Sequence, residues 1–287
     1  MPDSTAQPVV HATAETINPA HYRALTEGAA LVQRSDRGVL RVTDADRADF
    51  LQRMTTNNIQ ALGPGRSAVT VLTSPTARIL FVFTVVYEPD ALLLLPAAGQ
   101  SAALLRHLRG QIFFMDKVKV QDVSGELARL RVLGPQAADV LAALGLAVAG
   151  LADNETQRQD DLLAIRQQQY GLPGYELVVP AARQAEIVAA LTAAGAMSLD
   201  DEGALLARRV ELGRPAPGAE LVEEYNPLEA GLAWACAENK GCYTGQEIIA
   251  RQITYDKVTR TLVGLIADRP LTPGDEVTLE GRNAGAV

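Results

Sequence analysis

Lys240-Gly241-Cys242-Tyr243-Thr244-Gly245-Gln246-Glu247 is the stretch of this 287-residue sequence that says most about its fold. Gly241 and Gly245 bracket a cysteine, and glycines allow the backbone to turn sharply or to approach a ligand closely. Thr244 is followed three residues later by Glu247, which is the pattern of a capping box. A helix is therefore predicted to begin at Gly245 or at the residue after it.

Cys242 would lie just before the N-terminus of this helix, where unpaired backbone amides favour a negative charge. Lys240 stands two residues away, and a neighbouring cation also favours the thiolate. Both features predict a reactive, partly exposed thiol at Cys242, and a small buried cysteine in a loop is the alternative. Cys236, the other cysteine, follows an apolar stretch and is predicted to belong to the core.

The composition is typical of a globular protein, with 48% hydrophobic and 21% charged residues. A formal net charge of -8 argues against a surface for stable nucleic-acid binding. Two cysteines without a CxxC pair predict neither a closed zinc site nor a disulfide framework, so no metal ligand is assigned with certainty and a reducing compartment is expected. The N-terminus has no secretory pattern and the apolar runs are too short to span a bilayer. We therefore expect a cytoplasmic protein without a membrane partner.

The pattern of expected elements predicts an α+β fold. Strands at 68–72, 79–87 and 91–95 precede a helix, and a similar order recurs later, so two units of similar build are expected. Prolines and glycines at 213–218 interrupt the second unit. The expected division is a flexible arm over 1–20, a first unit over 21–124, a second unit over 125–258 and a tail of short strands over 259–287.

The peptide 240–247, together with Arg251, resembles the KGCYxGQE signature of the YgfZ family of folate-binding proteins. That family is related to the aminomethyltransferase, or T-protein, of glycine cleavage. The motif leaves few positions free, so its specificity is high, and the resemblance extends over about residues 22 to 287. The other similar segments are Thr55–Asn58, Tyr170–Leu177, the RxExGxP pattern Arg208–Pro215, and Asn226–Leu232.

The resemblance implies a cloverleaf of two α+β units and a C-terminal β-barrel, incomplete over 259–287, around a tetrahydrofolate pocket. The first unit, 21–124, would contribute to folate binding. In that superfamily the glutamate of the RxExGxP segment holds the pterin, and the matching residue is Glu211. A carboxylate suits this role because it can accept from the ring N–H and the exocyclic amine together. A simple pair with Arg208, three residues earlier on a helix, is the alternative.

Other residues match family positions less directly. Met54, Asn58, Tyr175 and Arg251 are assigned to the ligand by the same resemblance. The alternatives for the first three are core packing, a turn that ends a helix, and a strand aromatic. The remaining motif residues are Gly241, Tyr243, Gly245, Gln246 and Glu247.

The T-protein carries an aspartate pair, one of them catalytic, where this sequence has Phe81 and Val82. Neither side chain can accept a proton or stabilise a developing charge, so conventional aminomethyl transfer is not expected. The resemblance then implies an accessory protein for iron–sulfur client proteins, tRNA-modifying enzymes among them, that uses Cys242 and a reduced folate. One cysteine cannot hold a four-cysteine cluster, so any iron–sulfur cluster would be transient. A folate-dependent aminomethyltransferase and a folate-free interaction scaffold are the alternatives.

Overall fold

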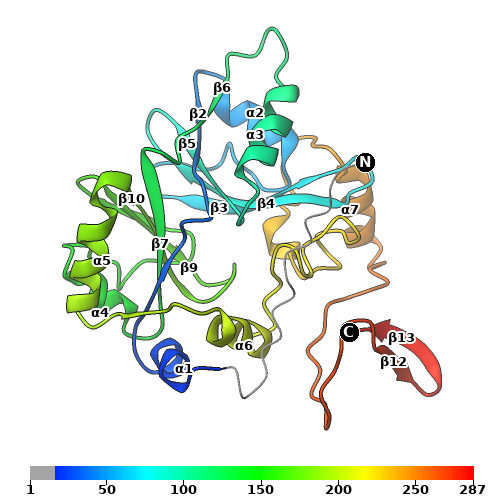
Figure 1. The fold of residues 1–287 in the computed structure, drawn as a ribbon. Helices are drawn as coiled ribbons and strands as arrows, with labels where there is room; N and C mark the ends of the chain where they lie inside the picture. The colour runs from blue at the N-terminus through cyan, green and yellow to red at the C-terminus, as the bar shows by residue number, and fades with distance from the viewer. Residues whose placement is uncertain (1–16) are drawn as a thin grey trace.

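The computed structural model describes residues 17–287, and these form a mixed α+β protein built on two large sheets (Figure 1). The first sheet is antiparallel, in the order β3-β4-β5-β2-β6. Its strands are β2 (Leu40–Thr43), β3 (Ser67–Thr73), β4 (Ile79–Tyr87), β5 (Leu92–Pro96) and β6 (Lys119–Asp122). Helices α2 (Arg47–Met54) and α3 (Ser101–Gly110) cover one face, because their leucines and Phe50 share a core with that face of the strands.

The second sheet has six strands in the order β11-β1-β7-β10-β9-β8. Its strands are β1 (Ala30–Gln33), β7 (Leu127–Leu133), β8 (Thr156–Gln159), β9 (Leu162–Gln167), β10 (Gly174–Pro180) and β11 (Met197–Ser198). Strands β1 and β11 are parallel, and the other pairs are antiparallel. Helix α4 (Ala137–Ala142), the short helix η1 (Ala181–Arg183) and helix α5 (Gln184–Ala193) follow strands of this sheet, and α4 and α5 share a core with its outer face.

The inner faces of the two sheets contact each other. Residues such as Leu93 of the first sheet pack against Ile165 and Val178 of the second. Successive side chains of a strand point to opposite faces, so each strand supplies both an outer core and this inner contact. The sheet-on-sheet contact also contains polar side chains, because Thr84 of β4 accepts a hydrogen bond from Gln167 of β9 at 2.7 Å.

The predicted α+β class is confirmed, but two expected boundaries differ from the structure. Strand β1 lies within the range 21–124, yet it pairs with β7 and β11 of the second sheet. A four-residue strand carries no local signal of its partner, so sequence order alone placed it in the wrong unit. The expected arm over 1–20 falls mostly outside the described residues. Helix α1 (Pro19–Thr26) already begins at Pro19, with the Asn18 side chain accepting from the backbone amide of Ala20.

The last third of the chain returns to the first sheet. Helix α6 (Gly203–Glu211) packs on α1, and a long irregular segment with the short helix η2 (Ala233–Ala235) then lies against β3 and β4. Helix α7 (Gln246–Thr254) follows. The tail forms one exposed hairpin, β12 (Glu276–Leu279) and β13 (Arg282–Ala286), which Figure 1 shows apart from both sheets. Among the described residues, no helix is both long and apolar enough to cross a membrane.

Candidate functional site

The signature peptide, residues 240–247, is fastened to the first sheet and to the end of α2. The Lys240 ammonium donates to the main-chain carbonyl oxygens of Gln52 and Asn57, both at 2.7 Å, and to that of Thr55. These oxygens lie at or just beyond the C-terminal end of α2, where the helix dipole favours a positive charge. Burial lowers the pKa of Lys240 to about 8. Lys240 therefore joins the peptide to the first unit.

The second half of the peptide is fixed by an aromatic ring and a glycine. Tyr243 is buried, and the centre of its ring lies 4.9 Å from Lys240 Nζ. Gly245 has a φ of 83°, and a Cβ at this position would lie 2.8 Å from the carbonyl oxygen of Ser74. Only glycine fits such a left-handed turn against a neighbouring backbone. The Thr244 carbonyl accepts from the Thr73 hydroxyl at 2.6 Å, which holds the turn against the end of β3.

Helix α7 begins at Gln246, as predicted, but the predicted capping box does not form. The N-cap residue is Gly245, which has no side chain, and no side chain caps the helix. Thr244 lies one residue too early because the left-handed glycine turns the chain between it and the helix. Glu247 pairs with Arg251 at 2.6 Å instead of reaching back to a cap. The first turn of α7 is therefore held by backbone geometry.

The two cysteines have different environments. Cys242 is exposed, whereas Cys236 is buried. Burial raises the pKa of Cys236 to about 11, although a hydrogen bond with Thr56 and the charge of Lys240 act in the opposite direction. The sequence predicted that Lys240 acts on Cys242. In the structure the hydrogen bonds of the Lys240 ammonium are made to the end of α2.

Glu211 lies at the end of α6, beside α1. Both of its carboxylate oxygens accept from the Tyr22 hydroxyl at 2.8 Å, and Arg208 donates to one of them at 3.0 Å. These contacts, with Arg208 first, lower the pKa of Glu211, and its side chain remains 44% exposed. The pair with Arg208, the alternative drawn from the sequence, is thus present. A cleft of about 320 Å³ lies next to this pair and includes Arg208 and Tyr175 in its lining.

The other assigned ligand residues mostly have structural contacts. Met54 packs in the core of the first sheet. The Asn58 side-chain oxygen Oδ1 accepts from Gln52 Nε2 and from the backbone amide of Ala61, both at 3.2 Å, which closes the turn after α2. Tyr175 is 1% exposed, and its hydroxyl donates to a backbone carbonyl at 3.1 Å. The alternatives of core packing, turn and strand aromatic therefore describe these three side chains in this structure.

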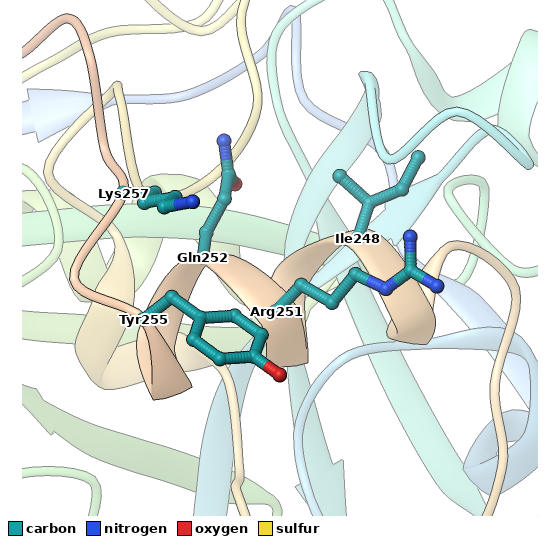
Figure 2. Close-up of a pocket in the computed structure, with 5 residues that line it drawn as sticks. All are labelled: Ile248, Arg251, Gln252, Tyr255 and Lys257. Carbon is teal, nitrogen blue, oxygen red and sulfur yellow. The ribbon is translucent and has the colours of Figure 1, made fainter.

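Arg251 lies on the outer face of α7, away from Glu211. A shallow groove of about 520 Å³ runs there and is lined by Ile248, Arg251, Gln252, Tyr255 and Lys257 (Figure 2). In Figure 2 the Arg251 side chain extends along the helix toward Ile248. Its guanidinium pairs with exposed Glu247. The structure thus separates the predicted residues into three places: the peptide at α2, the cleft at α6, and the face of α7.

Phe81 and Val82 have apolar surroundings. Val82 is 2% exposed and packs with residues of the segment that carries η2, Leu232 among them. The Phe81 ring lies on the other face of β4, where its centroid is 5.8 Å from that of His107. Neither position brings a carboxylate to this part of the sheet.

Sequence reasoning missed several polar groups. Tyr22, which holds Glu211, lies 189 residues away in the chain, so no local pattern could have found it. Arg129 and Arg131 alternate with leucine and valine along β7, and this period-two pattern was a usable signal for two buried arginines. His21, Asp200 and Asp201 form the one group in the described part of the chain whose ligand atoms lie close enough together to hold a metal ion.

Comparison with known proteins now identifies the family. The model of the GCVT N-terminal domain matches residues 6–240. This chain belongs to the GCVT N-terminal domain family. The fold of the glycine cleavage system aminomethyltransferase T from Bartonella henselae is similar, with a TM-score of 0.73 over 82% of this chain and 66% of that one, at 22% identity.

The relatives of this GCVT-domain chain include a putative transferase and several aminomethyltransferases. A putative chloroplastic transferase from Arabidopsis thaliana is 32% identical, over 92% of this chain and 62% of its own length. An aminomethyltransferase from Geobacillus kaustophilus is 31% identical, over 93% of this chain and 76% of its own length. An aminomethyltransferase from Mycobacterium avium is 29% identical, over 80% of this chain. The chain spans 62% and 64% of the lengths of the Arabidopsis and Mycobacterium relatives.

Proposed function

We propose that this protein binds a reduced folate, tetrahydrofolate or a one-carbon derivative, beside α6, and acts as a YgfZ-like accessory factor. The observation that carries the folate part is the Glu211 carboxylate, which is exposed, has a lowered pKa and lies next to a cleft in a GCVT-domain fold. A cleft of about 320 Å³ is at the lower end of the range for small-molecule sites.

The donor chemistry fits a pterin. An ionised carboxylate can accept from a ring N–H and an exocyclic amine in a planar, two-point match. In the present arrangement Tyr22 occupies both carboxylate oxygens, so a pterin would take the place of the Tyr22 hydroxyl. Arg208 would stay and hold the orientation of the carboxylate. Bound folate would supply a carrier for one-carbon units.

The accessory role is supported by two regions away from α6. Apolar Phe81 and Val82 occupy the segment where the T-protein carries its aspartates, and neither side chain can accept a proton. Cys242 is exposed on a peptide that is fastened on both sides of it. An exposed thiol on a peptide that is held in place on both sides can contact a partner protein. We propose iron–sulfur proteins, tRNA-modifying enzymes among them, as the clients.

Aminomethyl transfer is the second candidate, because a relative that is 31% identical carries the name aminomethyltransferase. In that case a carboxylate from another part of the chain would have to replace the missing aspartates. Methylene transfer from an aminomethylated lipoyl carrier distinguishes the two candidates. Turnover at a rate typical of enzymes, about 1 per second or more, would reject the accessory role.

Anaerobic calorimetric titration with tetrahydrofolate tests the folate site. The wild type should bind, and Glu211→Gln should bind about tenfold more weakly or worse, because the amide replaces one acceptor oxygen by a donor. Glu186→Gln is the matched control, since Glu186 also pairs with an arginine three residues earlier on an exposed helix. An unchanged affinity in Glu211→Gln would reject this site. Absence of binding by the wild type would favour the folate-free scaffold.

A further inference from the structure

Four arginine side chains gather between the two sheets, outside every site described above. Leu130 and Val132 of β7 face the outer core, so Arg129 and Arg131 point to the opposite face, as alternation along a strand requires. Glu176 of β10 faces the same side and is paired in register with Arg131. Arg34 follows directly after β1 and Arg37 lies three residues further on, so the cluster consists of Arg34, Arg37, Arg129 and Arg131.

The cluster contains more positive than negative charge. Glu176 accepts from Arg129 Nε at 2.7 Å and lies 3.4 Å from Arg131 Nη1 and 3.6 Å from Arg34 Nε. Burial alone would raise the pKa of Glu176, but the four arginines together lower it to about 2. The only further acid paired with the group in the described chain is Asp36, 3.9 Å from Arg37 Nε and 61% exposed. One buried carboxylate thus pairs with three guanidinium groups, and Arg37 adds a fourth positive charge nearby.

Two buried guanidinium nitrogens of the cluster have no acceptor among the described residues. Arg129 donates to the Pro96 carbonyl at 2.6 Å, and the terminal nitrogens of Arg131 are bonded to Gln167 and to main-chain carbonyls. The Nε atoms of Arg131 and Arg34, however, are buried without a hydrogen-bond partner in the described part of the molecule. The Arg131 side chain is 3% exposed, so leaving its Nε without an acceptor costs free energy.

The excess of positive charge also affects Arg34. Burial lowers the pKa of Arg34 to about 9, and Arg37, Arg131 and Arg129 act in the same direction against Glu176. Two of the four side chains reach solvent, since Arg34 is 18% and Arg37 26% exposed. The cluster is therefore open at the turn after β1 and closed on the side of β7.

We propose that this cluster binds a compact group with two negative charges on oxygen, from a phosphate or from the two carboxylates of a glutamate. Planar guanidinium forks match the oxygens of both groups, and a dianion would compensate the excess charge. Such an anion would enter beside Arg34 and Arg37 and meet Arg131 last. The phosphate form is independent of the folate proposal, whereas the form that takes the glutamate tail of a folate rests on it.

The first test uses inorganic phosphate and the full chain, in chloride buffer at constant ionic strength. Phosphate should bind saturably by calorimetry, and the double variant Arg34→Gln/Arg37→Gln should raise its Kd by about tenfold or more. In phosphate-free buffer the same variant should be at least as resistant to urea as the wild type, because like-charge repulsion is relieved. Arg183→Gln is the control. It removes one positive charge from η1, directly before α5, and should leave phosphate binding unchanged.

The second test distinguishes the two sources of the anion. Tetrahydrofolate and tetrahydropteroate, which lacks the glutamate, are titrated into the wild type and the double variant. If the double variant binds tetrahydrofolate more weakly than the wild type does, but binds tetrahydropteroate equally well, the cluster binds the glutamate tail. Arg37→Gln alone replaces the double variant if that fails to fold, because Arg37 donates no side-chain hydrogen bond within the described residues.

The proposal is overturned if neither phosphate nor the glutamate moiety binds the wild type more tightly than the arginine variants. It is also overturned if Arg183→Gln weakens phosphate binding equally, since that would indicate a general charge effect. Failure of the folate proposal has a different signature. Tetrahydrofolate binding would then be absent or insensitive to Glu211→Gln, while phosphate binding would still depend on Arg34 and Arg37.

Discussion

The signature peptide and the inter-sheet cluster both place positive charge out of water, and they do so in opposite ways. Lys240 is one cation held by three main-chain carbonyl oxygens. The cluster around Glu176 has four guanidinium groups for one buried carboxylate, and two of its buried nitrogens have no acceptor in the described chain. The first arrangement is complete within the protein, whereas the second has capacity for another anion.

This difference indicates what each region is for. A half-buried cation whose acceptors are supplied by the backbone joins two segments, and it needs no ligand. A cluster with surplus charge costs free energy unless a counter-charge is present. We therefore expect removal of one contact of the peptide to lower the stability of the protein. In the cluster, removal of the carboxylate should lower the stability, whereas removal of an arginine should not.

Glu176→Gln should produce the largest loss of stability. It removes the one carboxylate buried among four guanidinium groups, and breaking such a pair costs about 3–5 kcal/mol in urea unfolding. Added phosphate should restore part of the loss. A cost below about 1 kcal/mol would mean that the cluster is better solvated than the structure indicates.

The same carboxylate predicts a pH dependence. Its pKa in the folded state, about 2, is below the ordinary value of 4.5. Its stabilising contribution is therefore fully present above about pH 4.5 and is lost as the pH falls toward 2. The difference in unfolding free energy between wild type and Glu176→Gln should be constant above that pH and shrink below it. A difference that grows in acid would contradict the pairing.

Lys240→Met should come next. It keeps the length of the side chain but removes three charge-assisted hydrogen bonds, with an expected cost of about 2–4 kcal/mol. Buried Cys236 should then become accessible to alkylation, because the peptide that covers it is loosened. Lys257→Met, at a lysine that stands over an exposed tyrosine ring on the groove side of α7, is the control and should change neither quantity. If both variants changed the unfolding free energy and the alkylation of Cys236 equally, Lys240 would not be the residue that joins the peptide to α2.

The two glycines of the motif are expected to differ in their tolerance of a side chain. Gly245→Ala should cost about 1–3 kcal/mol, because its φ of 83° and the nearby Ser74 carbonyl oxygen leave no room for a Cβ. Gly241→Ala should change the unfolding free energy by less than about 0.5 kcal/mol, since nothing lies within 4 Å of a Cβ there. Urea unfolding of both variants measures the contrast, and similar values for the two would contradict it.

The smallest effect on stability is expected at Cys242. Cys242→Ser should leave the unfolding free energy within about 0.5 kcal/mol of the wild type, because the side chain is exposed. Alkylation of the native protein at pH 8 should modify Cys242 and spare Cys236, which is buried and has a pKa of about 11. Peptide mass mapping identifies the modified thiol, and labelling of Cys236 first would reverse the assignment.

The sequence predicted the class of fold and the place of α7, because these depend on local patterns. Continuous runs of β-branched and apolar residues marked the long strands of the first sheet, and the motif marked the start of the last helix. It did not predict that β1 belongs to the second sheet, because a partner about a hundred residues away leaves no local trace. The capping box failed for a similar reason, since the left-handed turn of Gly245 depends on contact with Ser74.

The candidate site was predicted less completely. Residue types indicated a carboxylate at Glu211 and a thiol at Cys242, but not the partners of either. Tyr22 reaches Glu211 from the other end of the chain, and Lys240 turns away toward α2. These contacts arise only when distant segments meet. The family resemblance supplied roles for Met54, Asn58 and Tyr175, whereas packing explains the contacts that they make.

The most direct test of the central claim is a crystal structure of the full chain with tetrahydrofolate bound. We predict that the pterin ring donates to the Glu211 carboxylate and that the Tyr22 hydroxyl has left it, with Arg208 still in contact. A pterin bound against Phe81 and Val82, or in the groove of α7, with the Tyr22–Glu211 contact intact, would contradict it.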